Sequence, residues 1–220
     1  MEWLAKYGDQ PLSLIILLFI LSLLPLLVVV GSSFLKISIV LSLLRNALGI
    51  QQVPPNMAIY SMALILTIFI MAPVGYQIND NIKAAPFTLE DEQVFERVDG
   101  QILNPWRQFM TQHTHKKQIQ FFSQTATSLW PEEVRKQVSE DSIFVVLPAF
   151  MVSQLVEAFK IGLLLYLPFI AIDLIISNIL LAMGMMMVSP MTISLPFKIL
   201  VFIMIGGWER LLTQLILSYK

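Results

Sequence analysis

Residues 10–35, with the sequence QPLSLIILLFILSLLPLLVVVGSSFL, contain no Asp, Glu, Lys, Arg or His. Two further stretches, 46–79 and 174–197, are equally free of charge. Each is longer than the roughly 20 residues that a helix needs to cross the hydrocarbon core of a bilayer. These three stretches therefore predict membrane helices, and with them the fold class.

The composition of the whole chain favours the same class. Of its 220 residues, 56% are apolar and only 13% are charged, and the mean hydropathy is +0.74. Soluble domains carry roughly 25% charged residues, so this chain cannot cover a water-exposed surface in the usual way. The net charge of −1 gives no attraction to nucleic acid. The absence of cysteine excludes disulfides and thiolate metal sites.

The charged residues are concentrated in one part of the chain. More than half of them, together with both histidines, lie between Asp80 and Asp141. We therefore expect an all-α integral membrane protein in three parts. These are N-terminal membrane helices over 1–79, a soluble helical insert over 80–141 and C-terminal membrane helices over 142–220.

The expected membrane helices follow the apolar runs. They cover 12–33, 57–78, 142–167, 169–189 and 197–217. The last two are close enough in sequence to form a helical hairpin. The third is interrupted by Glu157 and Lys160, so it either crosses at an angle or extends the insert. Within the insert, Thr88 followed by acids, and Pro131 followed by Glu132 and Glu133, are typical of helix N-termini.

Basic residues predict the orientation in the membrane. The loop expected after the first span carries Lys36 and Arg45 and no acid, and the linker 191–198 carries Lys198 alone. Positively charged loops stay on the cytoplasmic side. With four crossings, the insert and both termini then lie on the opposite side.

Prolines are frequent in the apolar segments. Proline removes a backbone donor and clashes with the preceding turn, so it kinks or breaks a helix. Broken helices in a membrane occur mainly where they pack on protein or line a wet cavity. Half of the 12 prolines lie within or at the ends of apolar segments: Pro25, Pro73, Pro148, Pro168, Pro190 and Pro196. Ordinary kinked spans remain an alternative, but the set favours a pore-like or multi-subunit assembly.

Charged side chains in apolar segments need a partner or water, because each costs ~2.5–3.5 kcal/mol on insertion scales. We expect Asp173 to pair with Lys198 across the hairpin or with a neighbouring subunit. Glu157 and Lys160 are three residues apart, so they can neutralise each other.

Lys36 and Arg45 have two interpretations. On a helix, Arg45 would share a face with Ser38 and Ser42, while Lys36 would lie on the opposite side. The simpler interpretation makes both residues interfacial anchors that set the topology. The alternative gives them a role in charge pairing or assembly.

The stretch MGMMMVSP at 183–190 is the third unusual feature. Three methionines in a row cannot all face one core, because consecutive helical positions point ~100° apart. Met185, Met186 and Met187, with Met183, are therefore either flexible packing filler or a deformable apolar plug in a loop at a pore constriction.

Motifs for catalysis and cofactor binding are missing from the sequence. It has no phosphate-binding glycine loop, no GxGxxG and no GxSxG. His113 and His115 lie beside two lysines without nearby acids in sequence, so we expect a solvated face and not a metal site. We expect no enzyme, no metal and no cofactor.

Ordered sequence blocks run along almost the whole chain. They are Gly31–Phe34, Ile37–Gly49, Pro54–Asn56, Asn104–Met110, Pro148–Phe150, Ala158–Gly162, Pro168–Phe169, Asp173–Leu174, Met183–Met187, Thr192–Lys198 and Gly207–Trp208. Together they resemble the FliP/SctR family of type III export-gate proteins. The length resembles that of the injectisome branch.

This resemblance implies a non-enzymatic subunit of the bacterial inner-membrane export apparatus. About five copies are expected to assemble helically with FliQ/SctS-like and FliR/SctT-like subunits into a pore for unfolded proteins. The large FlhA/SctV-like and FlhB/SctU-like export proteins are expected partners as well. The methionine stretch would be the gasket of that pore, and the insert and both termini would be periplasmic. Much of the assembled gate would lie above the membrane plane.

Two other functions are left open by the residues themselves. A proton-coupled transporter or small-ion channel would use Asp173, Arg45 and Lys198 as relay groups. Such a relay usually needs several acids or histidines at depth, and Asp173 is nearly alone. A passive scaffold without a pore would be indifferent to replacement of Met185–Met187 by alanine.

Overall fold

The computed structural model describes residues 11–50, 53–84, 98–135 and 139–220. Every regular element in these ranges is a helix, which confirms the all-α prediction. The elements are α2 (Pro11–Val30), α3 (Phe34–Leu48), α4 (Asn56–Ala84), the π-helix η1 (Val98–Leu103), α6 (Asn104–Gln112), α7 (Lys116–Leu129), α8 (Glu132–Arg135), α9 (Ile143–Ala182), α10 (Pro190–Met204) and α11 (Gly207–Leu217). The helix start expected at Thr88 lies outside the described residues.

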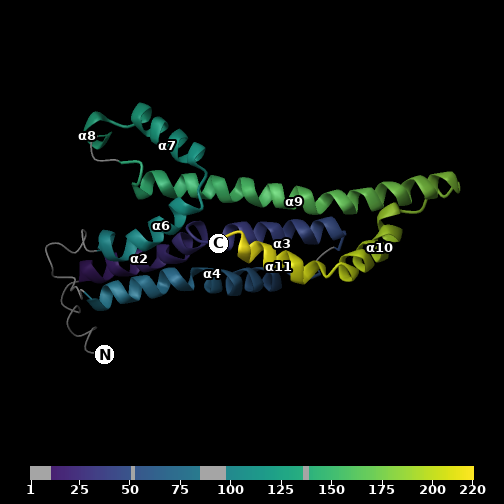
Figure 1. Ribbon diagram of the computed structural model, residues 1–220, viewed down its shortest axis with the longest axis horizontal. Helices are drawn as coiled ribbons and strands as arrows, with labels where there is room; N and C mark the ends of the chain where they lie inside the picture. The colour runs from purple at the N-terminus through teal and green to yellow at the C-terminus, as the bar shows by residue number, and fades with distance from the viewer. Residues whose placement is uncertain (1–10, 51–52, 85–97, 136–138) are drawn as a thin grey trace.

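The long helix α9 runs along most of the length of the molecule (Figure 1). The insert helices α6 and α7 pack against its N-terminal part, while α10 returns along its C-terminal part. Between these two groups, α3 packs against both α9 and α4. The tip of the α9–α10 hairpin and the insert therefore lie at opposite ends of an elongated shape (Figure 1).

Helix α3 is the centre of the main core. Its residues Ile37, Val40, Leu41 and Leu44 are at most 1% exposed, at the three- and four-residue spacing of a buried helix face. On the opposing helix, Gly162 lets α3 come close, because a Cβ there would lie 2.2 Å from a methyl carbon of Leu43. The expectation of a basic loop after the first span is therefore wrong for 34–48, which is a buried helix.

A second, smaller core joins the insert to the membrane helices. Phe109 and Met110 of α6 pack with Val146 and Phe150 of α9 and with Val74 of α4. The insert packs directly on α9, and α4 extends into the region assigned to the insert, since it ends at Ala84.

Helix α9 is continuous over 40 residues, although two helices divided at Pro168 were expected. Both Pro148 and Pro168 lie inside it. At a rise of 1.5 Å per residue the helix is about 60 Å long. This is roughly twice the thickness of a hydrocarbon core, ~30 Å.

The expected helix 197–217 is also divided differently. The structure forms α10 and α11 with an angle of 61° between them. The bend lies at Gly206, whose φ of +65° is left-handed and therefore suits glycine. Prolines do not break these helices: Pro25, Pro73, Pro148, Pro168 and Pro196 all lie inside helices.

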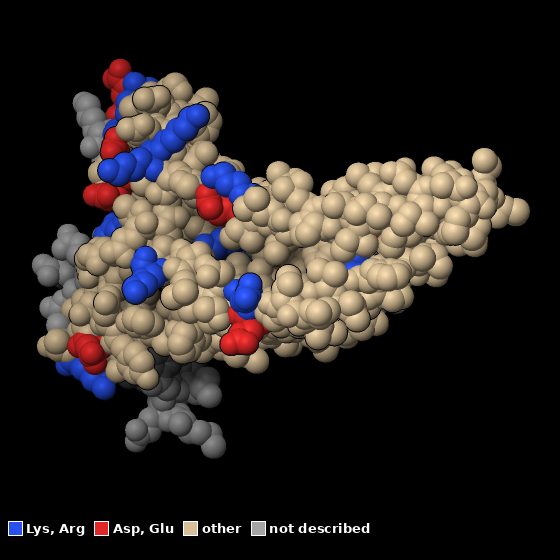
Figure 2. All heavy atoms as spheres, turned by 45° about the vertical axis from the view of Figure 1, so that its right-hand side comes forward, with Lys and Arg blue, Asp and Glu red and all other residues tan. Residues whose placement is uncertain are grey.

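Two of the described helices, α4 and α9, are long and apolar enough to cross a membrane. The bent pair α10–α11 adds a third if it counts as one span. Figure 2 shows the Lys, Arg, Asp and Glu side chains of one face gathered toward the insert end and the middle, while the hairpin end is almost free of them. The molecule therefore separates a charged end from an apolar arm.

Candidate functional site along the helical hairpin

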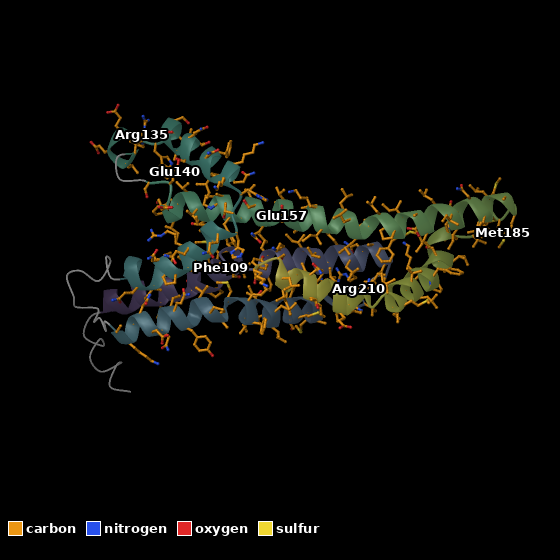
Figure 3. All side chains as sticks on the ribbon, in the orientation of Figure 1. Phe109, Arg135, Glu140, Glu157, Met185 and Arg210 are labelled. Atoms are coloured by element: carbon orange, nitrogen blue, oxygen red, sulfur yellow. The ribbon has the colours of Figure 1, made fainter. Side chains whose placement is uncertain are left out.

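The methionine loop, residues 183–189, forms the tip of the hairpin, where Figure 3 labels Met185. Helix α9 ends at Ala182, not at 189 as expected. The Gly184 N–H donates to Leu181 O (3.0 Å) and the Met185 N–H to Leu180 O (2.9 Å), with Gly184 at φ +73°. This is the hydrogen-bond pattern of a Schellman helix end. A left-handed glycine thus stops the helix and starts the loop.

The methionines of this loop are largely exposed within the single chain. Met186 is 81% exposed and Met187 is 102% exposed, while Met183 and Met185 are 59% and 43% exposed. They do not fill a gap in the core of their own chain. Their flexible thioethers are left to contact another molecule or another copy.

An ion pair links the two helices of the hairpin. Lys198 Nζ on α10 lies 2.6 Å from Asp173 Oδ2 on α9. The other carboxylate oxygen of Asp173 accepts from Ser194 Oγ at 2.6 Å. Lys198 Nζ also donates to Ala47 O at the end of α3, at 3.2 Å. The structure thus brings Asp173 and Lys198 together within one chain and ties both helices to the core helix.

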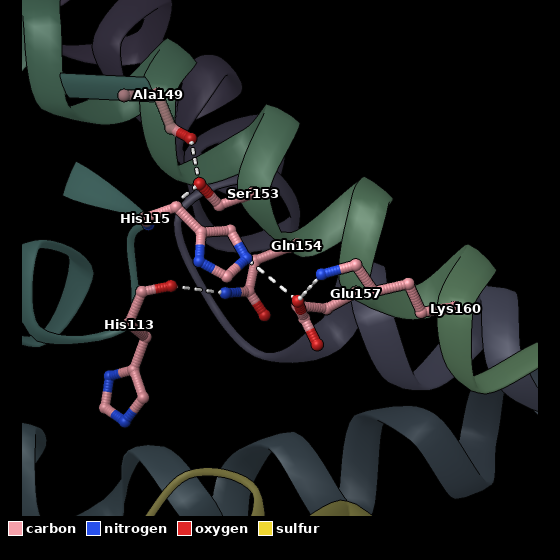
Figure 4. Close-up of polar contacts among 7 residues, drawn as sticks. All are labelled: His113, His115, Ala149, Ser153, Gln154, Glu157 and Lys160. Carbon is pink, nitrogen blue, oxygen red and sulfur yellow. Dashed lines mark hydrogen bonds and ion pairs between the residues drawn. The ribbon is translucent and has the colours of Figure 1, made fainter. Parts of the chain in front are cut away.

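A second polar cluster holds the corner between α6 and α7 on α9 (Figure 4). Glu157 Oε1 accepts from Lys160 Nζ and lies against His115 Nε2, both at 2.8 Å. Nearby, Gln154 Nε2 donates to His113 O at 2.8 Å and the His115 N–H donates to Ser153 Oγ at 3.1 Å. The expected neighbours Glu157 and Lys160 are therefore in contact, with His115 added.

The two histidines do not form the simple solvated face expected of them. His115 is exposed but contacts the carboxylate of Glu157, while His113 is half-buried against the rings of Phe109 and Tyr219. The acid comes from α9, far away in sequence, so no local pattern could indicate it. Among the described residues, no three His, Cys, Asp or Glu side chains converge as metal ligands.

Arg45 braces the ends of two helices. Its Nη1 donates to Asn56 Oδ1 at 2.6 Å and to Pro54 O at 3.3 Å, which connects the end of α3 to the start of α4. It also lines a cavity of about 710 Å³ together with Asn46, Asn56 and Met191. Arg45 is far in sequence from Asp173 and Lys198. Its hydrogen bonds go to Pro54 and Asn56 and not to either of these two residues.

Lys36 is buried, with only 4% of the residue exposed. Its Nζ lies 3.6 Å from the centroid of the Tyr219 ring. Burial lowers the pKa of Lys36 to about 8, and the charge of Glu157 partly opposes this change. Lys36 is therefore packed inside its own chain, and its role in setting the topology stays a prediction.

Tyr219 is a residue that sequence reasoning missed. Its hydroxyl donates to Gln154 Oε1 at 2.6 Å, and its ring stacks on Phe109 with a centroid separation of 6.0 Å. Burial raises the pKa of its phenol. In the sequence, only the aromatic character of Tyr219 indicates that it could pack against other residues.

These charged groups hold helices in position. The Asp173 carboxylate and the Glu157 carboxylate are each engaged by a lysine. The hairpin arm, residues 163–204, exposes a large apolar surface that no described part of the chain covers. Its exposed apolar side chains include Leu163, Leu164, Leu167, Ile170, Leu174, Ile175, Ile179, Leu181, Met191, Ile193, Phe197, Leu200, Ile203 and Met204.

Comparisons with known proteins agree along nearly the whole chain. The model of the FliP family matches residues 17–215. The chain is 51% identical over 217 residues to "Virulence protein YscR" of Salmonella typhimurium, which covers 96% of this chain and 98% of the relative. It is 52% identical over 208 residues to "Yop proteins translocation protein R" of Yersinia pestis, with coverage of 94% and 96%. It is 46% identical over 210 residues to "Harpin secretion protein HrcR" of Erwinia amylovora, with coverage of 96% and 97%.

Proposed function

The chain belongs to the FliP family, and on this premise we propose that it is a core pore-forming subunit of the type III secretion export gate. It is a component of the type III export apparatus and, with its long apolar helices, a membrane protein. The names of its relatives, which speak of virulence, Yop translocation and harpin secretion, fit the injectisome branch. The gate would conduct unfolded proteins across the bacterial inner membrane.

The exposed methionine loop at the tip of the hairpin is the observation that carries the pore proposal. Met186 and Met187 are almost fully exposed in their own chain, and their loop lies at the end of an apolar arm, where Figure 3 labels Met185. If several copies converge, their loops form a ring of unbranched side chains that adapts to varying shapes. An apolar constriction of this kind blocks ions by excluding water. The loop would be the gasket that closes the pore around a passing chain.

The exposed apolar arm supports an assembly of several subunits. Soluble monomers rarely expose contiguous apolar patches above a few hundred Å², and a helix of about 60 Å exceeds the ~30 Å of hydrocarbon that lipid can cover. Neighbouring subunits would cover the remainder. We propose about five copies with FliQ/SctS-like and FliR/SctT-like subunits, and contacts to FlhA/SctV-like and FlhB/SctU-like proteins.

The charged contacts would hold the hairpin in the shape that the pore needs. The ion pair between Asp173 and Lys198 joins its two helices, and Lys198 joins them to the end of α3. The loop would therefore be presented by a braced arm. In the membrane, we propose that the insert and both termini face the periplasm.

The gasket is tested by replacing Met185, Met186 and Met187 together by alanine in the co-expressed complex. We expect inner membranes that contain the variant to leak small ions, because alanine leaves the constriction wider and wettable. The measurement is the decay of an imposed ion gradient in membrane vesicles. The matched control is Met204→Ala, since Met204 is 78% exposed on the same arm but lies outside the loop.

Assembly of the variant must be measured in the same vesicles. Intact assembly with an unchanged leak contradicts the gasket. It leaves a passive scaffold, or a transporter whose conduction does not involve the loop.

A further inference from the structure

Lys36 carries a buried ammonium that is not paired with a carboxylate. It lies in the first turn of α3, 4% exposed, and its Nζ faces the ring of Tyr219 at 3.6 Å from the centroid. A buried charge is costly unless it is paired and hydrogen-bonded. A cation–π contact recovers only part of that cost, about 1–2 kcal/mol. The ammonium of Lys36 would therefore be stabilised by an anionic hydrogen-bond acceptor.

Glu157, the acid whose charge acts on Lys36, is already engaged. Its Oε1 accepts from Lys160 and lies against His115, each at 2.8 Å. In the part of the chain that the structure describes, no Asp or Glu oxygen lies within 4.0 Å of Lys36 Nζ. Within residues 11–50, 53–84, 98–135 and 139–220, Lys36 therefore has no counter-ion at contact distance.

A cavity of about 520 Å³ gives access to this ammonium. Lys36, Gln154, Glu157 and Tyr219 line it, and the exposed residues Gln112, His115 and Lys220 lie among its other lining residues. The lining comes from α3, from the corner between α6 and α7, from α9 and from the C-terminus. A side chain of a neighbouring protein can therefore enter it without displacing a helix.

We propose that this cavity receives an aspartate or glutamate side chain of a partner membrane subunit and that Lys36 is its counter-ion. One buried ammonium matches one carboxylate. Glu157 in the same cavity would repel a phosphate group with two negative charges more strongly than a single carboxylate, because the repulsion scales with charge. Burial lowers the pKa of Lys36 to about 8, so the ammonium remains mostly protonated at pH 7. The inference rests on the proposed place of the chain in a multi-subunit apparatus.

The test uses Lys36→Met, which keeps the length of the side chain and removes its charge. In the complex co-expressed with the FliQ/SctS-like and FliR/SctT-like subunits, we expect recovery of these partners with the variant to fall at least tenfold. In the chain purified alone, we expect the melting temperature to stay equal or rise, because an unpaired buried charge has been removed. A fall in partner recovery without a fall in melting temperature distinguishes a role in partner binding from a role in folding.

Controls define the charge and the site. Lys36→Arg keeps a cation and should retain partner recovery, while Lys116→Met removes an exposed lysine of α7 and should change neither readout. Wild-type chain that recovers no partner contradicts the proposed function itself. Wild-type recovery with equal recovery by Lys36→Met overturns only the cavity inference.

Three further results also overturn the inference. A lower melting temperature of Lys36→Met alone means that the ammonium is satisfied inside its own chain. Loss of self-association with unchanged partner recovery assigns the acid to a second copy. Loss of binding to phosphatidylglycerol vesicles with unchanged partner recovery assigns Lys36 to a lipid headgroup.

Discussion

Lys198 shows how one side chain can serve three helices. Its Nζ contacts Asp173 of α9 and Ala47 O of α3, while its own backbone belongs to α10. The lysine is 3% exposed, so these two acceptors replace the water that would otherwise solvate its ammonium group. The hypothesis of a pair across the hairpin could be formed from the sequence, because Asp173 and Lys198 are isolated charges in facing apolar segments. The contact with Ala47 could not, because a backbone carbonyl carries no sequence signal.

Replacing Asp173 by alanine should destabilise the hairpin. It leaves the buried ammonium of Lys198 with only a carbonyl, and breaking a fully buried pair costs ~3–5 kcal/mol. Since the Asp173 side chain is 32% exposed, we expect a smaller loss in the free energy of unfolding, roughly 2 kcal/mol. Thermal unfolding of the detergent-solubilised chain measures it, and secretion should fall in parallel.

The exchanged pair, Asp173→Lys with Lys198→Asp, should recover part of the lost stability and secretion. The matched control is Glu209→Gln, which removes an exposed carboxylate of α11 and should change neither stability nor secretion. Two single variants at 173 and 198 that both secrete and melt like the wild type would refute the role of the pair.

Among the helices, the junction between α2 and α3 is tied to the insert by one close contact. Trp106 Nε1 of α6 donates to Gly31 O at 2.6 Å. A Cβ on Gly31 would lie 2.0 Å from the Trp106 ring, so only glycine allows the indole to lie across the backbone. This contact fixes how the insert packs on the membrane helices.

The variant Gly31→Ala should displace Trp106 and break this hydrogen bond. Overpacking of a close contact costs about 1–3 kcal/mol, so we expect a lower melting temperature and greater proteolysis of the insert. Gly75→Ala is the matched control, because nothing lies within 4 Å of a Cβ there and the residue lies inside α4. Alanine in a helix interior gains up to ~1 kcal/mol over glycine. Equal stability of the two variants would show that the contact does not form.

The positions of several helices could be predicted, but their ends could not. The segments 12–33 and 57–78 fall on α2 and α4, because long apolar runs have one solution in lipid. The segment 34–48 was expected to belong to the loop between two spans, with Lys36 and Arg45 setting the orientation. Its 15 residues are too short for a span but sufficient for a buried helix. The division expected at Pro168 is absent, since an apolar helix packed on neighbours tolerates proline.

At the candidate site, sequence reasoning found the charged residues and missed their neutral partners. Asp173, Lys198, Glu157 and Lys160 stand out as charges in apolar segments. Ser194, Gln154 and Tyr219 do not stand out, because their roles come from contacts between distant parts of the chain. The methionine stretch was found by its composition, and the interpretation that places it in a loop agrees with the structure, although the helix was expected to run to 189.

The whole molecule has a charged end and an apolar arm that its own chain leaves uncovered (Figures 1 and 2). Within the arm, the exposed side chains of α9 and α10 face outward on both helices of the hairpin. A bilayer covers only ~30 Å of such an apolar surface. The part that extends beyond the bilayer is stable only when other protein covers it. The uncovered arm therefore predicts an obligate assembly.

The most direct test is the mass of the detergent-extracted complex after co-expression with the FliQ/SctS-like and FliR/SctT-like subunits. Each copy of this chain contributes 25.0 kDa. We predict one discrete species of several times that mass that contains all three proteins, because the apolar arm needs neighbours. A monomer or homodimer of this chain that leaves both partners unbound would contradict a pore-forming export gate.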